Sequence, residues 1–211
     1  MASAGVERKN YPLKLFLKKS DLEKAHLYVQ QKIISHKRKL IAVQDDFELK
    51  WNEQEFLKLK KLLEEKYNII YIGKNMTLNN KNLNMRESAA VISLCDLFVG
   101  GISGNMHAAV AVGTTTMCTS SVFNPEWDMP EYYQNEFIKD DKKKHITIRP
   151  KNENFCGDFK CVSLSEKAVI VSNSERQFGY ATKICPAGLP QSCIHSIRAE
   201  DIFLRIQDYF N

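Results

Sequence analysis

Residues Asp96 to Ala109 read DLFVGGISGNMHAA, and this stretch decides the fold. Its first five residues contain the apolar run Leu97-Phe98-Val99, which is typical of a buried strand. Two glycines and a Ser-Gly step follow, and small apolar residues then predict a helix from Gly104 to Val112. A buried strand that passes through glycines into a helix is typical of α/β proteins, so we expect a parallel sheet here.

The same alternation of strand and helix extends on both sides of this stretch. We expect the first helix to begin at an N-cap, Ser20, because Glu23 follows three residues later. Strands joined by helices imply right-handed crossovers and a sheet covered on both faces, so the fold class is α/β with a Rossmann-like parallel sheet. The other strands are expected at residues 40–43, 68–73, 114–119 and 145–148, and the helices at 20–34, 52–67, 85–95 and 199–206, with an extended connector at 11–17 and a loop at 75–84.

The chain divides into three parts by pattern. Residues 1–38 form a leader, a connector and an N-terminal helix, and residues 39–149 form the Rossmann-like core. Residues 150–211 contain a cysteine-bearing segment and a C-terminal helix.

Composition limits the classes of function. The net charge is +5, but the lysines and arginines do not form a basic stripe interleaved with aromatic residues, so no nucleic-acid partner is expected. No apolar run approaches the roughly 20 residues that span a bilayer. The first ten residues lack the apolar segment of a secretory signal, so we expect a cytoplasmic protein.

Ligands of parallel α/β sheets bind beyond the carboxyl ends of the strands. Three loops are expected there, at residues 44–52, 73–84 and 100–105. In the third, the amides at the start of the helix favour an anion such as a diphosphate. Ser103 could bond a phosphate oxygen or simply cap the helix, and His107, one turn on, could face the same ligand or be a core histidine bonded to backbone.

Two motifs resemble glycosyltransferase family 9, the ADP-heptose:lipopolysaccharide heptosyltransferases and their relatives. The stretch from Asp96 to Ala109 is similar to the family pattern aDlfVG-x-D-[ST]-G-x-x-H-x-A-x-A. Lys50-Trp51, after the first core strand, is similar to the family's K-x-W-P loop. The resemblance covers roughly Tyr11 to Asn211.

The resemblance implies the C-terminal, donor-binding domain of a two-domain GT-B glycosyltransferase. Its donor is a nucleoside-diphosphate sugar similar to ADP-heptose, transferred to an acceptor hydroxyl without a catalytic metal or other cofactor. Lys50 would contact the diphosphate, and the start of the helix would bind the phosphates and line the pocket. The substrate-binding residues implied there are Ser103, Gly104, Asn105, Met106 and His107. No catalytic residue is implied.

Two departures from the family keep a second function open. Ile102 stands where the family has an acidic residue that contacts the donor sugar, and an alkyl group cannot imitate a carboxylate. The family's N-terminal acceptor domain has no counterpart in these residues, so we expect a fragment, a split-gene product or a domain that works with a separate acceptor domain or protein partner. The alternative is a catalytically inactive nucleotide-sugar-binding or interaction module that needs such a partner.

The cysteines fall into two groups. Cys95 and Cys118 lie in apolar stretches and are expected to be buried and inert. Four others could form a tetrahedral thiolate site for structural zinc or iron, or remain unliganded thiols. Relatives of the family with a four-cysteine iron site near the C-terminus favour the metal. These four are Cys156, Cys161, Cys185 and Cys193.

Overall fold

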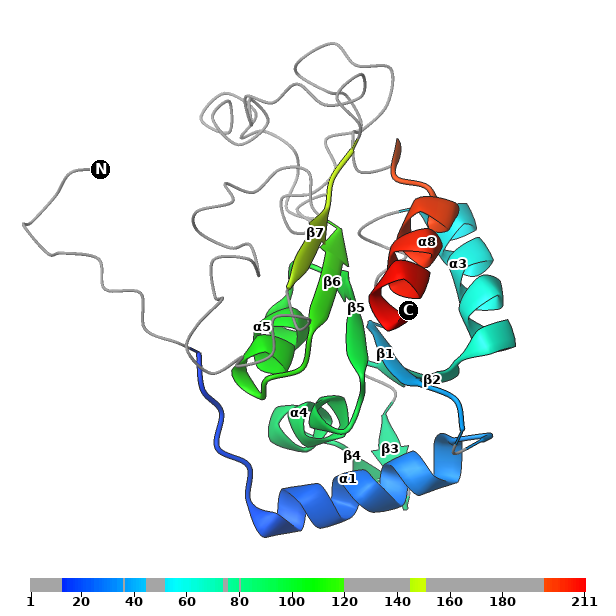
Figure 1. Ribbon diagram of the computed structural model, residues 1–211. Coiled ribbons are helices and arrows are strands. Elements are labelled where there is room, and N and C mark those ends of the chain that lie inside the picture. Colours follow the sequence, from blue (N-terminus) through cyan, green and yellow to red (C-terminus); the bar gives the residue numbers. More distant parts are fainter. Residues whose placement is uncertain are drawn as a thin grey trace, which may run out of the picture.

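The computed structural model describes residues 13–35, 37–44, 52–73, 76–79, 81–119, 145–150 and 196–211. At its centre is a parallel sheet with strand order β2-β1-β5-β6-β7 (Figure 1). This confirms the predicted α/β class. The strands are β1 (Leu40–Gln44), β2 (Asn68–Ile72), β5 (Leu97–Gly101), β6 (Thr116–Thr119) and β7 (Ile146–Ile148).

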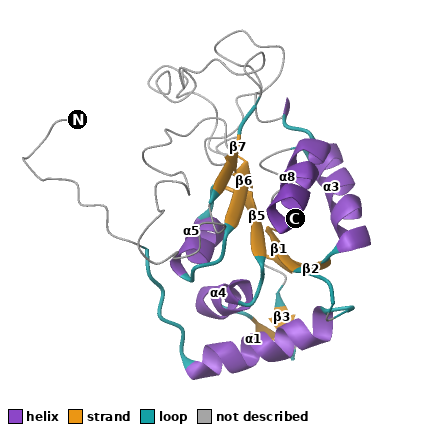
Figure 2. Cartoon of the chain, viewed as in Figure 1, coloured by secondary structure: helices purple, strands orange, loops and turns teal. Residues whose placement is uncertain are grey.

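Helices cover the sheet on both faces (Figure 2). One apolar cluster joins one face of the sheet to the helices at residues 19–32, 85–93 and 104–111. A second cluster joins the other face to the helices at residues 53–66 and 199–210. No helix in the described ranges is long and apolar enough to cross a membrane. The helices are α1 (Lys19–Lys32), α3 (Glu53–Lys66), α4 (Met85–Ser93), α5 (Gly104–Ala111) and α8 (Ala199–Phe210).

Burial of both faces explains why the strands read as apolar runs without alternation. In β5, Phe98 points into the cluster of α1, α4 and α5, whereas Leu97 and Val99 point into the cluster of α3 and α8. All three side chains are at most 1% exposed. Fully burying a side chain of this size stabilises the fold by about 1.5–3 kcal/mol, so both layers contribute to the stability of the sheet.

The start of α1 differs from the prediction. The helix begins at Lys19 after the N-cap Lys18, so Ser20 lies inside its first turn and the expected cap at Ser20 is wrong. The Asp21 carboxylate, three residues after the N-cap, caps the backbone of Lys18: its Oδ2 accepts a 2.9 Å hydrogen bond from the Lys18 amide. A carboxylate in the first turn also interacts favourably with the helix dipole.

A short antiparallel hairpin interrupts the expected loop at residues 75–84. Its strands are β3 (Thr77–Leu78) and β4 (Lys81–Asn82), and Asn79 adopts a φ of 52° between them. Asparagine tolerates this left-handed region better than most residues, which suits it to the turn. The Asn-rich composition predicted a loop, and strands of two residues leave no periodic signal to detect.

The terminal helices pack directly against the expected core of residues 39–149. Lys24 of α1 pairs with Glu87 of α4. At the other end, the amide of Ala199, the first residue of α8, donates a 2.6 Å hydrogen bond to Glu55 Oε2 of α3. Both helices therefore complete the layers of the sheet.

Candidate functional site

The order of the strands marks one position in the sheet. After β1 the chain moves outward to β2, and it then returns to place β5 on the other side of β1. The order therefore reverses between β1 and β5, and open α/β sheets bind ligands in the crevice outside the carboxyl ends of such strands. Here β1 ends at Gln44, and β5 ends at Gly101 and leads into α5 (Figure 1).

Gln44 bridges this switch point. Its side chain is part of a residue only 1% exposed, and its Oε1 accepts two hydrogen bonds from the turn that follows β5. The donors are the Gly101 amide at 3.2 Å and the Ser103 hydroxyl at 2.9 Å. A neutral buried side chain thus ties the end of one central strand to the turn after the other.

Gly100 makes room for this bridge. A Cβ at this position would lie 2.7 Å from Gln44 Oε1 and 2.9 Å from Gln44 Cβ, closer than such atoms approach. The φ of Gly100 is not positive. Among the glycines of the described residues, only Gly113 has a positive φ, of 82°. The glycine is therefore needed for close approach to Gln44 and not for an unusual backbone conformation.

Ser103 caps α5. Its backbone is extended, with φ −163° and ψ 170°, and its hydroxyl oxygen accepts a 3.2 Å hydrogen bond from the Met106 amide. The hydroxyl proton is donated to Gln44, and the Ser103 carbonyl accepts a 3.1 Å bond from the His107 amide. The first amides of a helix have no partner within the helix. In the described structure the amides of Gly104 and Asn105 therefore stay available to donate hydrogen bonds to a ligand.

The remaining residues of the motif divide by burial. The side chains of Ile102 and Met106 belong to the apolar cluster beneath the turn, where the residues are 6% and 0% exposed. Gly104 is exposed, whereas Asn105 and His107 are half-buried. The surface that the turn offers to a ligand is thus mainly the backbone of Gly104 and Asn105, with His107 one turn further along.

Several predicted site residues lie outside the described residues. These are Lys50, with its neighbour Trp51, and the four cysteines Cys156, Cys161, Cys185 and Cys193. Their roles stay predictions. The described part of the chain holds no group of three or more histidine, cysteine or acidic side chains that could bind a metal ion.

Cys95 and Cys118 are buried, as expected, and neither forms a disulfide bond in the described structure. Burial raises the pKa of the Cys95 thiol far above its ordinary value, and the neighbouring Asp96 carboxylate raises it further. Because the thiolate is the reactive form, Cys95 is inert.

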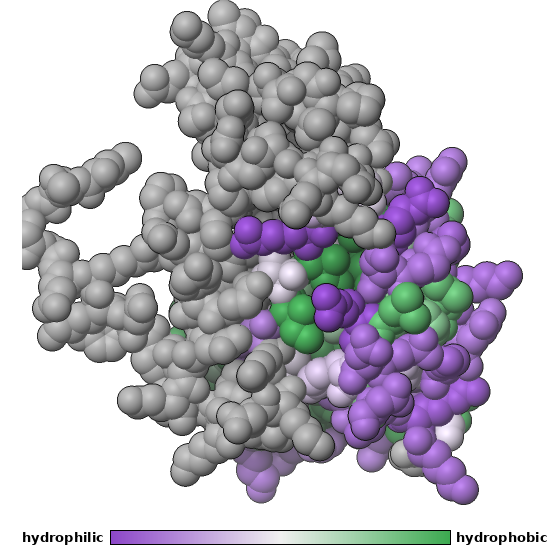
Figure 3. Space-filling view, turned by 45° about the horizontal axis from the view of Figure 1, so that its top comes forward, coloured by the Kyte–Doolittle hydropathy of each residue, from purple (hydrophilic) through white to green (hydrophobic). Residues whose placement is uncertain are grey.

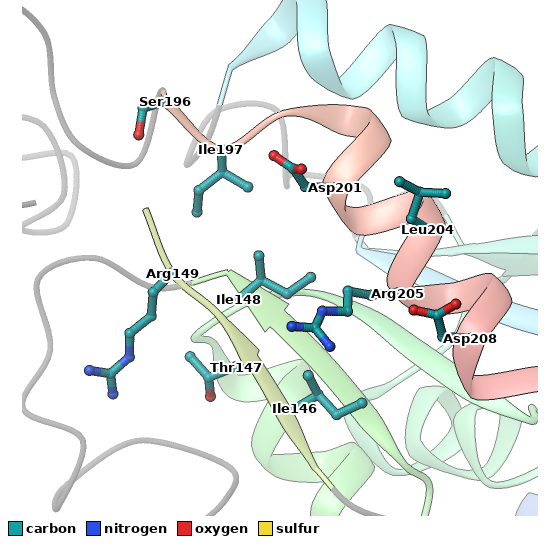
Figure 4. Close-up of a pocket in the computed structure, with 10 residues that line it drawn as sticks. All are labelled: Ile146, Thr147, Ile148, Arg149, Ser196, Ile197, Asp201, Leu204, Arg205 and Asp208. Carbon is teal, nitrogen blue, oxygen red and sulfur yellow. The ribbon is translucent and has the colours of Figure 1, made fainter. Parts of the chain in front are cut away.

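A cavity of about 500 Å³ lies between β7 and α8 (Figure 4). Figure 3, tilted so that the carboxyl ends of the strands come forward, shows hydrophobic surface among hydrophilic side chains on this side of the molecule. Sequence reasoning missed the cavity, because its lining comes from segments some fifty residues apart along the chain. That lining combines isoleucines with charged side chains, among them Arg149, Asp201, Arg205 and Asp208.

Comparison with known proteins supports the fold. No family model matches the sequence, and no curated protein matches it. A glycosyltransferase of family 9 from Veillonella parvula DSM 2008 superposes with a TM-score of 0.56 and 13% identity, over 94% of this chain and 53% of that one. The E. coli ADP-heptose LPS heptosyltransferase II superposes with a TM-score of 0.53 and 13% identity, over 93% of this chain and 53% of that one.

The chain spans about half the length of these solved structures. At 13% identity the likeness carries the fold and not the activity. The protein therefore has the α/β fold of about half of a family 9 glycosyltransferase chain, as the resemblance of its motifs indicated.

Proposed function

We propose that this chain is the donor-binding domain of a heptosyltransferase-like glycosyltransferase and that it binds a nucleoside-diphosphate sugar similar to ADP-heptose. The observation that carries the proposal is the turn between β5 and α5. It lies at the switch point of the sheet, and it leaves the amides of Gly104 and Asn105 at the start of a capped helix. The likeness to family 9 structures supports it.

Anion binding at this turn draws on two physical contributions. The dipole of a helix favours an anion at its N-terminus by about 0.3–1 kcal/mol when the site is exposed. A hydrogen bond to a charged group adds about 1.5–3 kcal/mol, so bonds from the two amides and from Lys50 would dominate. In this proposal Lys50 extends from the loop after β1, and Ser103, Met106 and His107 support the turn.

The proposed reaction is displacement at the anomeric carbon by an acceptor hydroxyl. The bond between the sugar and the diphosphate breaks, and the departing diphosphate carries the developing negative charge. Donors that already point at that charge lower the barrier, and the helix start and Lys50 would supply them. The acceptor and the base that takes its proton would come from a separate acceptor domain or a partner protein.

Ile102 favours the second candidate, a nucleotide-sugar-binding module without transfer activity. The side chain is 6% exposed and packs in the apolar cluster, so this position presents no carboxylate to the sugar. A module of this kind would keep the diphosphate site and lack the sugar contact. The two candidates therefore share the diphosphate site and differ in catalysis.

Calorimetric titration with ADP, GDP and UDP tests what the two candidates share. We expect at least one to bind, and we expect Lys50→Ala to weaken that binding by about 1.5–3 kcal/mol, the contribution of a charge-assisted hydrogen bond. Lys61→Ala, on the exposed side of α3, is the matched control and should leave the affinity unchanged. Absence of binding at millimolar nucleotide would refute both candidates.

A transfer assay separates the two candidates. The chain is mixed with an acceptor-binding domain, and transfer of sugar to the acceptor is measured. Transfer supports the enzyme, whereas tight donor binding without transfer supports the module.

A further inference from the structure

We propose that Gln44 is a positioning residue for the diphosphate. It holds the turn after β5 in the conformation that presents the amides of Gly104 and Asn105. This inference rests on the proposed function, because it assigns a role at the same site. It adds that affinity for the diphosphate depends on a side chain that belongs to the neighbouring strand.

The hydrogen bonds of Gln44 fix both ends of the short turn. One acceptor atom, Oε1, receives the amide of Gly101, the last residue of β5, and the hydroxyl of Ser103, the N-cap of α5. Only Ile102 lies between these two residues, and its side chain packs in the apolar cluster. The direction of the first amides of α5 therefore depends on Gln44.

The type of residue at this position also matters. A carboxylate could accept the same two hydrogen bonds, but it would place a negative charge next to the start of the helix, where the diphosphate is proposed to bind. A like charge nearby disfavours a second anion, and burial strengthens this repulsion because the local dielectric constant is low. A carboxamide supplies the acceptor without the charge.

A purely structural role would predict something different. If Gln44 only stabilised the fold, its loss would lower the stability and change the affinity for every part of the nucleotide alike. A positioning role predicts a selective loss. Binding of the nucleoside diphosphate should weaken while binding of the matching nucleoside, which lacks phosphates, stays the same.

Three variants make the test. Gln44→Met keeps the length of the side chain and removes the acceptor, and Gln44→Glu keeps the acceptor and adds a charge. Asn68→Ala is the matched control, because Asn68 is another buried amide, at the amino end of β2, that accepts from the amides of Ile34 and Ser35 at 3.1 and 3.3 Å. It lies at the opposite end of the sheet from the turn.

The measurement is the ratio of affinities for a nucleoside diphosphate (ADP, GDP or UDP, whichever the wild type binds best) and its nucleoside. For Gln44→Met we expect this ratio to fall about tenfold, since a lost hydrogen bond contributes on this scale. For Gln44→Glu we expect a fall that grows as the pH rises and the introduced carboxylate ionises. Asn68→Ala should lower the unfolding temperature and leave the ratio unchanged.

The outcomes are distinct. Ratios equal to that of the wild type for both Gln44 variants would overturn the inference and leave the proposed function standing. If Gln44→Met does not fold, the pH dependence of Gln44→Glu decides, and a flat profile at the wild-type ratio overturns the inference. A wild-type chain that binds none of the diphosphates overturns the proposed function, and the inference with it.

Discussion

Individual residues in the turn after β5 have structural roles that the sequence reveals only in part. At Gly100 the absence of a side chain lets the backbone approach Gln44 closely. Gly104 is different, because the nearest atom to a Cβ placed there is the terminal methyl of Met85 at 3.5 Å. The same residue type therefore has a packing role at one position and no steric role at the other.

Alanine at these two glycines should have opposite effects. Gly100→Ala should lower the free energy of unfolding by about 1–3 kcal/mol, the usual cost of overpacking a well-packed core. Gly104→Ala should raise it by up to about 1 kcal/mol, because alanine is the better helix former. Chemical denaturation measures both. Equal effects of the two substitutions would contradict the packing argument.

His145 is a buried histidine next to β6. The Thr116 amide donates a 3.2 Å hydrogen bond to its Nδ1, so the proton of the neutral ring is on Nε2. Burial disfavours the charged ring and lowers the pKa of His145 to about 4. In the described structure Nε2 has no hydrogen-bond partner.

Acid should therefore destabilise the protein through His145. The unfolded chain takes up the proton near pH 6.5 and the folded chain near pH 4, so this contribution to stability is complete above pH 6.5 and is lost as the pH falls toward 4. Since one pKa unit corresponds to about 1.4 kcal/mol, the loss should reach about 3 kcal/mol. Denaturant unfolding between pH 7 and 4.5 measures most of it.

His145→Gln should remove this slope, and His26→Gln, on the exposed side of α1, should retain it. The ion pair between Glu87 and Lys24 does not obscure the result. The pKa of Glu87 is lowered by its hydrogen bond with Lys24, so its contribution persists through this window and is lost only at lower pH. An unchanged slope in His145→Gln would show that another group is responsible.

At the scale of elements, apolar patterning located the main strands and helices because each buries apolar side chains at a regular spacing. The apolar pattern predicted the ends of these elements less accurately. α8 was expected to stop at residue 206 and continues to Phe210, because Tyr209 bonds Thr115 through its hydroxyl at 3.1 Å and Phe210 packs on Tyr67. Contacts between distant segments extended the helix, and a local pattern does not contain them.

The docking of α8 on the sheet should contribute strongly to stability. Ile202 is fully buried in the cluster shared with α3, so Ile202→Ala should lower the free energy of unfolding by about 2–5 kcal/mol through lost burial and a cavity. Leu204, which is 57% exposed on the same helix, is the matched control. Its replacement by alanine should change the stability by less than about 0.5 kcal/mol.

A small effect of Ile202→Ala would mean that α8 is not an integral part of the core. Denaturant unfolding of both variants gives the answer. The difference between them is the informative quantity, because both substitutions introduce alanine, the best helix former, and so raise the helix propensity by similarly small amounts.

At the scale of the whole molecule, the sequence predicted the layered α/β fold and the end of the sheet at which the candidate site lies. It did not predict the role of Gln44, because a hydrogen bond between residues 57 and 59 positions apart has no local signal. The cavity between β7 and α8 was missed for the same reason. Topology brings these groups together, and topology follows from the packing of all the elements.

Amide chemical-shift mapping by NMR, with ADP, GDP or UDP added to the wild-type chain, tests the central claim most directly. If the start of α5 binds the diphosphate, the largest shifts should occur at the amides of Gly104 and Asn105, and the matching nucleoside should not reproduce them. Shifts centred instead on Arg149 and Arg205, in the cavity between β7 and α8, would contradict the account, as would a spectrum that the diphosphates leave unchanged.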